Sequence, residues 1–69
     1  MDIRQAIAKN IRLLIKSSGK TQSQIGEEIG VAQTTVGNYM LGKAVPSLLV
    51  LIKLCQILDC TYEDILGQL

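Results

Sequence analysis

Residues 21–43, TQSQIGEEIGVAQTTVGNYMLGK, decide the fold because they contain two short helical patterns separated by Gly30. Thr21 is followed three residues later by Gln24, which predicts a capping box: the Thr21 side chain accepts from the Gln24 N–H, and the Gln24 side chain reaches back. A first helix is therefore expected to begin after Thr21 and to end at Gly30, since glycine readily adopts the left-handed conformation that closes a helix.

The second helix of this stretch is predicted from Ala32 or Gln33 to about Leu41, where a glycine follows. At 100° per residue, Gln33 shares one face with two further polar side chains, Thr34 and Asn38. The opposite side carries the apolar residues Ala32, Val36, Tyr39 and Met40. The polar face has no charge but offers bidentate donor and acceptor groups, and such groups suit the reading of base edges in a DNA major groove.

Helices are also predicted on both sides of this stretch. Ahead of it, a helix that stops at Ser17-Ser18-Gly19 carries on one face Ile3, Ile7, Ile11 and Leu14. Behind it, the segment SLLVLIKLCQILD is apolar around almost its whole circumference, as expected of a central buried helix or of one covered by a partner. Thr61 caps a last helix of one or two turns, TYEDIL. The sequence therefore predicts an all-α bundle of five helices in a single domain over residues 1–69.

The composition indicates a small aliphatic core. The chain has 69 residues, of which 48% are apolar, with no Trp or Phe and only two Tyr. A chain of this length buries only about 60% of its unfolded surface, so dimerisation would add stability. The longest uncharged stretch near the middle, AVPSLLVLI, is far short of the roughly 20 residues of a membrane span. The N-terminus has no apolar signal region, and we expect a cytoplasmic protein that does not bind membranes.

The charges are unevenly spread, although the net charge is only +1. Residues 1–26 carry five basic side chains and one acidic side chain, whereas residues 27–69 carry two basic and five acidic side chains. Such a division would orient the molecule on a polyanion, although solvated helix faces also produce it.

Nothing in the sequence predicts an enzyme, a metal site or a cofactor. Cys55 and Cys60 are too few for a disulfide framework, and without a histidine they form neither a familiar zinc set nor a Cys–His nucleophile pair. We interpret them as small buried apolar residues. The sequence contains no phosphate loop and no acid pair with a matching nucleophile, and no small-molecule ligand is evident.

Residues 22–41 resemble the helix-turn-helix proteins of the lambda repressor-like class, the Cro and cI type of phage and bacterial regulators. Gln22 stands where the first motif helix opens, Gly26 takes the small-residue site where the two helices cross, and Gly30 makes the turn. The apolar positions of the motif are filled by Ile25, Ile29, Val31, Val36 and Tyr39. The segments NIRLLIKSSGKTQ and VPSLLVLIKLCQILDCTYEDIL are similar to the family's first and last two helices, so the resemblance covers nearly the whole chain.

The resemblance implies a small DNA-binding transcriptional regulator, in its simplest form a repressor that binds a palindromic operator as a homodimer. In that family the second motif helix enters the major groove, which implies that the base-reading residues are Gln33, Thr34 and Asn38. Gln22 and Lys43 would contact phosphate groups. Further candidates for phosphate contact are Thr35, Arg12 and Lys16; the alternatives are a hydrogen bond to its own helix for Thr35 and simple solvation for the other two.

The sequence departs from the family pattern in three ways. Ile15 and Met40 stand where the family has an Arg and a Glu joined by a partly buried ion pair, and because both partners are apolar here we expect the two side chains to touch. Ala32 replaces a common Ser or Thr N-cap, and Gly37 lies inside the helix. We therefore expect a recognition helix that is less rigid than usual.

Dimerisation is predicted through apolar residues near the start of the fourth helix and in the C-terminal turn. These residues are Val45, Leu49, Tyr62, Ile65, Leu66 and Leu69. The alternative is that they fold back onto the core. Two other functions stay open at this point: a regulator of the antitoxin or restriction-control type with a protein partner, and a helical interaction adapter that does not bind DNA.

Overall fold

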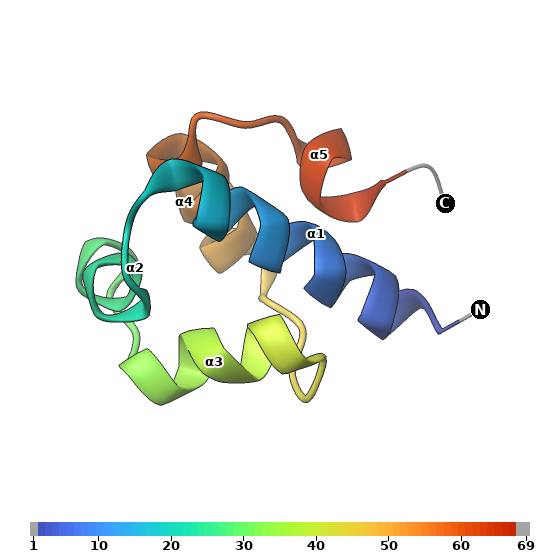
Figure 1. Cartoon of the computed structure of the whole chain (residues 1–69), viewed down its shortest axis with the longest axis horizontal. Helices are drawn as coiled ribbons and strands as arrows, with labels where there is room; N and C mark the ends of the chain where they lie inside the picture. The colour runs from blue at the N-terminus through green and yellow to red at the C-terminus, as the bar shows by residue number, and fades with distance from the viewer. Residues whose placement is uncertain (1, 68–69) are drawn as a thin grey trace.

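A computed structural model describes residues 2–67 of the chain and contains five helices in this range. They are α1 (Ile3–Ser18), α2 (Gln22–Ile29), α3 (Gln33–Leu41), α4 (Leu48–Leu58) and α5 (Tyr62–Leu66). In Figure 1, α1 crosses the molecule between α3 on one side and α5 on the other, while α2 is seen end-on beside the start of α3. The predicted all-α bundle, with a helix-turn-helix formed by α2 and α3, is confirmed. Within residues 2–67, no helix has the length and apolar character that crossing a membrane requires.

Local hydrogen bonding determines where these helices begin and end. The predicted capping box is present at α2, where Thr21 Oγ1 accepts from the Gln24 N–H at 3.1 Å and Gln24 Oε1 accepts from the Thr21 N–H at 2.8 Å. The first three helices each end at a glycine in the left-handed region, namely Gly19, Gly30 and Gly42. A second capping box, between Thr61 and Asp64, starts α5, and the sequence predicts only its Thr61 half.

The core is aliphatic, as the composition predicts, and draws on all five helices. Its buried apolar residues are Ile7, Ile11, Ile15, Ile25, Ile29, Val36, Tyr39, Leu54, Cys55 and Ile65. Ile15 is thus part of this core, and Met40 is partly buried against it. The two residues that replace the family's ion pair are therefore both in apolar surroundings, where an unpaired charge would be costly.

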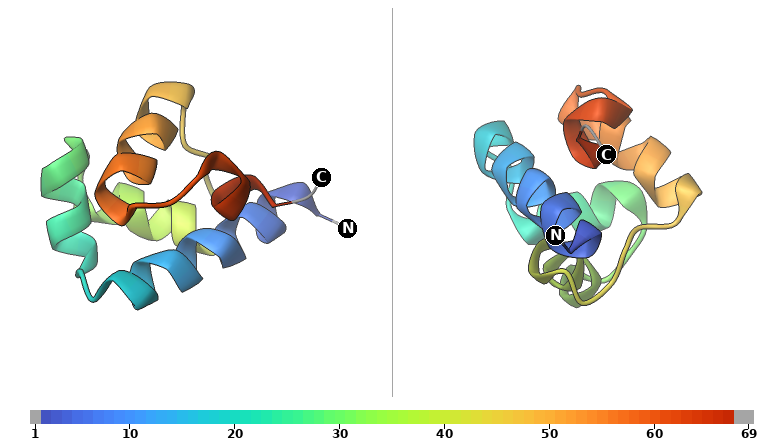
Figure 2. Two further views of the ribbon diagram at one scale, coloured as in Figure 1. Left: turned by 90° about the horizontal axis from the view of Figure 1, so that it is seen from above. Right: turned by 90° about the vertical axis from the view of Figure 1, so that its right-hand side faces the viewer.

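The sequence leaves open whether the fourth helix is central and buried or covered by a partner, and the structure leaves the first turn of α4 exposed. Leu54 and Cys55 in its second half are buried, but Leu48 is 73% exposed and Leu49 is 63% exposed. The first turn of α4 projects beyond the other helices (Figure 2), so the rest of residues 2–67 leaves it uncovered. The helix against which α3, α4 and α5 all pack is instead α1.

The two cysteines adjoin each other at the end of α4. Cys55 is buried as expected, whereas Cys60 is only half-buried. Burial, followed by the neighbouring Cys55, raises the pKa of the Cys60 thiol to about 11. Cys60 therefore stays protonated near neutral pH and packs as a small apolar residue.

Candidate nucleic-acid interface

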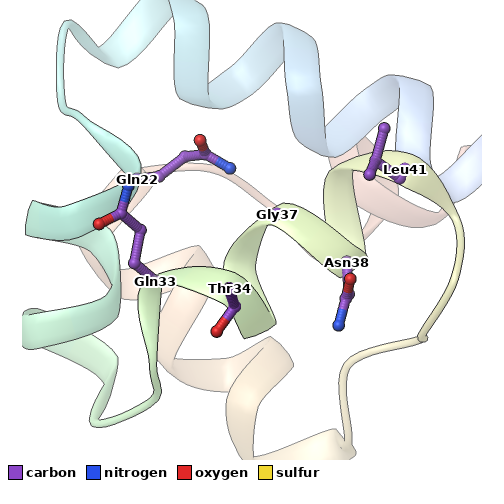
Figure 3. Close-up of a pocket in the computed structure, with 6 residues that line it drawn as sticks. All are labelled: Gln22, Gln33, Thr34, Gly37, Asn38 and Leu41. Carbon is purple, nitrogen blue, oxygen red and sulfur yellow. The ribbon is translucent and has the colours of Figure 1, made fainter.

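The three predicted base-reading residues lie together on the outer face of α3, and all three are exposed. Six residues line an open hollow of about 520 Å³ on this face, which we call the α3 hollow: Gln22, Gln33, Thr34, Gly37, Asn38 and Leu41 (Figure 3). None of the six carries a charge, but their amide and hydroxyl groups can both donate and accept hydrogen bonds. The polar face predicted from the helical wheel is thus one continuous surface, shared with the start of α2.

Gly26 brings α2 close enough to α3 for the two helices to share this surface. A Cβ atom at Gly26 would lie 2.7 Å from the Val31 carbonyl oxygen, so the crossing has no room for a side chain. The Gly26 carbonyl oxygen also accepts from the Gly30 and Val31 N–H groups at 2.8 and 2.9 Å, which closes the turn between the helices. The start of α2 is thereby held beside the middle of α3.

Gln22, the first residue of α2, extends its side chain across α3 towards Gly37 (Figure 3). Its Nε2 atom lies 3.1 Å from the position that a Cβ atom on Gly37 would take. The missing side chain at residue 37 therefore makes room for the Gln22 amide within the α3 hollow. The amide lies near the N-terminus of α2, where the helix dipole favours an anionic group such as a phosphate.

The first turn of α3 has no side-chain cap. Its N-cap residue is Ala32, as the sequence predicts, and only the Ala32 carbonyl oxygen closes the turn, by accepting from the Thr35 and Val36 N–H groups at 3.0 and 3.3 Å. Gln33 and Thr34 lie in this uncapped turn, and Thr35 is half-buried at its edge. Two base-reading candidates are thus carried by a helix end that no side-chain hydrogen bond caps.

The last turn of α3 is tied to α1 by two side chains. Arg12 Nη1 donates to the Met40 carbonyl oxygen, and Gln5 Nε2 donates to the Leu41 carbonyl oxygen at 3.2 Å. Arg12, one of the predicted phosphate contacts, is half-buried, and one edge of its guanidinium group is used within the protein. Its positive charge lies at the negative end of the α3 dipole, where a cation is stabilising.

The lysines predicted to contact phosphate are both exposed. Lys43 follows Gly42, which ends α3, and Lys16 lies in the last turn of α1. Neither lysine lines the α3 hollow. Of the predicted phosphate contacts, the structure therefore brings only Gln22 into the same surface as the base-reading residues.

Leu41 also lines the α3 hollow, although it is not among the residues predicted to contact DNA. It is 57% exposed and gives the otherwise polar face one apolar wall. The signal was available in the sequence, because on the helical wheel Leu41 falls beside Gly37 on the polar face. An apolar side chain at this place can contact a thymine methyl group.

Several residues of the predicted dimer surface are accessible. Val45, Leu49 and Tyr62 are 50%, 63% and 50% exposed, and Leu66 is half-buried. Leu48, which the prediction leaves out, is the most exposed large apolar residue of the described chain at 73%. An apolar surface is therefore present at the start of α4 and the start of α5.

Ile65 is the one member of the predicted dimer surface for which the structure shows the prediction to be wrong. Its side chain is fully buried in the core, and its carbonyl oxygen accepts from Asn10 Nδ2 at 2.9 Å. The reason is that α5 packs on α1, and Ile65, the fourth of its five residues, lies on the side that faces the core. Leu69, the last member of the predicted set, lies outside the described residues.

Residues 11–65 match the family model described as helix-turn-helix, which is more than half of the chain. The chain belongs to the helix-turn-helix family, and the resemblance to regulators of the Cro and cI type is confirmed.

Three known proteins illustrate this relationship. The chain is 38% identical to the uncharacterized HTH-type transcriptional regulator YgzD of Bacillus subtilis over 47 residues, which cover 68% of this chain and 71% of that protein. It is 30% identical to the cryptic phage CTXphi transcriptional repressor RstR of Vibrio cholerae over 53 residues, which cover 77% of this chain and only 47% of the repressor. The P22 c2 repressor protein, solved in complex with a synthetic operator, has a TM-score of 0.84 at 22% identity, over 91% of this chain and 96% of that chain, which confirms the fold.

Proposed function

We propose that the chain is a cytoplasmic, sequence-specific DNA-binding transcriptional regulator that inserts α3 into the major groove. The observation that carries this proposal is the α3 hollow, where uncharged amide and hydroxyl groups from two helices converge on one exposed surface. Groups that both donate and accept are what base edges require, whereas side chains that serve only solvation are mostly charged. The names of the two relatives support regulation of transcription, and one of them supports repression.

Base reading and DNA positioning fall to different residues in this proposal. Gln33 and Asn38 pair with N6 and N7 of adenine, and Thr34 packs its methyl group on thymine, so the preferred half-site contains A·T pairs. Contacts with phosphate groups orient the helix without reading sequence. The residues proposed for these contacts are Gln22, Lys43, Thr35 and Lys16.

Gln33→Ala is expected to weaken binding to the preferred duplex by about 1–3 kcal/mol and to relax the preference mainly at one base pair. Gln33 is exposed, so its removal leaves the core intact. The preferred duplex is first selected by the wild-type chain from a random pool. Fluorescence anisotropy then measures the affinity of both chains for this duplex and for each of its single base-pair variants.

Lys43→Ala is the matched control, because Lys43 is also exposed but does not line the α3 hollow. It should weaken binding to all duplexes alike and reduce the slope of log affinity against log salt by about one. If Gln33→Ala weakened every duplex equally, Gln33 would not be a base-reading residue. If the wild-type chain selected no sequence at all, the proposed function would be wrong.

We further propose that the regulator is a homodimer that pairs through α4 and α5. Leu48 and Leu49 project from the first turn of α4, and one turn later an open groove of about 350 Å³ follows between α4 and the start of α5. The groove is lined by Ile52, Cys55, Gln56, Cys60, Thr61 and Tyr62. In a two-fold arrangement the projecting leucines of each copy can fill the groove of the other. Such a pair would read half-sites about 34–36 Å apart, which is one turn of DNA.

Leu49→Lys is expected to abolish pairing and to lower the affinity for a palindromic duplex, while the affinity for a single half-site stays unchanged. Residue 49 is 63% exposed in one copy, so a lysine there remains solvated and the fold is preserved. Analytical ultracentrifugation at high micromolar concentration measures the pairing. Leu13→Lys on α1, where Leu13 is 54% exposed, is the matched control and should leave it intact. A wild-type chain that stays monomeric both alone and on a palindromic duplex would contradict the homodimer.

A further inference from the structure

We propose that Arg12 is a positioning residue for base reading: it holds the last turn of α3 against α1 through the Met40 carbonyl oxygen and does not contact phosphate. This inference rests on the proposed function, in which α3 reads bases. It assigns to a basic residue of α1 a part in sequence preference, whereas a basic residue on a DNA-binding domain would ordinarily be expected to add sequence-independent affinity.

The carbonyl groups at the end of α3 support this assignment. The last four carbonyl oxygens of a helix have no partner within the helix. Backbone N–H groups of the following turn satisfy the first two in α3: the Lys43 N–H donates to Asn38 at 3.0 Å, and the Gly42 N–H donates to Tyr39 at 3.4 Å. The last two accept instead from side chains of α1.

These two side chains come from one side of α1. Arg12 and Gln5 are seven residues apart, which is about two helical turns, so both project towards α3. Gln5 donates to the Leu41 carbonyl oxygen at 3.2 Å, and Arg12 donates to that of Met40. Together they fasten the end of α3 to α1 at two successive residues.

Arg12 contributes the stronger of the two links. A hydrogen bond from a charged guanidinium group is stronger than one from a neutral amide, and the half-burial of Arg12 limits competition from water. The charge also lies at the negative end of the α3 dipole. Both effects are lost if the guanidinium group turns away from Met40, so a phosphate contact that pulled this group outward would loosen the helix that reads DNA.

The side chains at this contact supply no polar link between α1 and α3. Ile15 is buried and Met40 is partly buried against the core, and neither side chain has a charged or strongly hydrogen-bonding group. Arg12 lies about one turn earlier on α1 and reaches the same residue, Met40, through its backbone. The polar link between the two helices at this point is therefore formed by the Arg12 guanidinium group and the Met40 carbonyl oxygen.

The last turn of α3 is held to α1 by side-chain hydrogen bonds, whereas its first turn is held by packing against α2. The first turn has no side-chain cap, and Gly37 lies in the middle of the helix. Asn38 and Leu41, which line the α3 hollow, lie in or next to the fastened turn. A change in the tilt of α3 at the fastened end displaces Gln33 at the opposite end, so the loss of Arg12 affects base reading along the whole helix.

The test compares Arg12→Met with Lys16→Met. Both substitutions remove one positive charge from α1, but Lys16 is exposed, whereas Arg12 donates to α3. Methionine keeps much of the apolar stem of each side chain. Three quantities are measured for the full chain: the affinity ratio between the selected duplex and a scrambled duplex, the slope of log affinity against log salt, and hydrogen exchange of the Gly42 and Lys43 amides.

Positioning predicts that Arg12→Met lowers the affinity ratio about tenfold, similar to the loss of one good base contact, and leaves the salt slope unchanged. Exchange at Gly42 and Lys43 should become faster, because their N–H groups close the turn that Arg12 holds. Lys16→Met should instead keep the affinity ratio and these exchange rates. If Arg12→Met lowered the salt slope by about one and kept the affinity ratio, Arg12 would be a phosphate contact and the inference would be wrong.

Two further results complete the test. An Arg12→Met chain with an unchanged affinity ratio and unchanged amide exchange would also overturn the inference. If Arg12→Met does not fold, Arg12→Gln takes its place, and an unchanged salt slope then supports positioning whereas a lower slope overturns it. A wild-type chain that prefers no duplex would instead refute the proposed function at the selection step, before any variant is compared.

Discussion

Leu54→Ala is expected to lower the free energy of unfolding by about 2–5 kcal/mol, which is the usual cost of removing a buried leucine side chain. Leu54 is fully buried and is one of the two buried residues of α4, so the packing of this helix depends strongly on it. A domain of this size has a total stability of roughly 3–10 kcal/mol. The substitution therefore removes a large part of the stability of the whole domain.

Leu48→Ala is the matched control for this prediction. It makes the same chemical change on the same helix, at a residue that is 73% exposed, and should alter the unfolding free energy by less than about 0.5 kcal/mol. Urea unfolding followed by circular dichroism measures both variants at a low protein concentration, to limit any contribution from pairing. Equal effects of the two substitutions would contradict the burial of Leu54.

Gly26→Ala is the second substitution with a large expected effect, a loss of about 1–3 kcal/mol of stability. The added Cβ atom would lie 2.7 Å from the Val31 carbonyl oxygen, and because this atom belongs to the backbone, the crossing of α2 and α3 has to open. The better helix propensity of alanine recovers only about 1 kcal/mol of the cost. The displaced α3 should also bind the selected duplex more weakly.

Gly37→Ala provides a control with the same change in the neighbouring helix. There the added Cβ atom meets only the end of the Gln22 side chain, at 3.1 Å, and this flexible group can move aside. Alanine should therefore stabilise the chain by up to about 1 kcal/mol. Thermal unfolding of both variants separates the two cases, and a Gly26→Ala chain as stable as Gly37→Ala would show that the helix crossing tolerates a side chain.

The parts of the fold that follow from neighbouring residues could be predicted from the sequence. The capping box of Thr21 and Gln24 involves atoms three residues apart, and the glycines after α1, α2 and α3 act through their own backbone conformation. The polar face of α3 follows from helical periodicity alone, and Gln33, Thr34 and Asn38 share one exposed face as predicted. Their contacts with bases stay a prediction.

The remaining features depend on contacts between distant residues, which periodicity does not reveal. Arg12 and Met40 are 28 residues apart, and only the packing of α3 on α1 brings the guanidinium group to the carbonyl oxygen. Ile65 belongs to a helix of five residues, too short for its apolar pattern to show which side faces the core. Leu48 is exposed because the first turn of α4 projects from the bundle. Since α4 is apolar around almost its whole circumference, its sequence does not indicate which turn is left uncovered.

Because the α3 hollow carries no charge, sequence preference and overall DNA affinity would depend on different residues in the proposed regulator. None of the residues that line it ionises, and the chain contains no histidine that would change its charge between pH 5 and 8. For the proposed regulator, we therefore expect the preference among sequences to change little with pH and ionic strength, while attachment through its lysines weakens as salt rises. For such a regulator, the amount of protein would set how many operators are occupied, while the preferred operator sequence would stay the same.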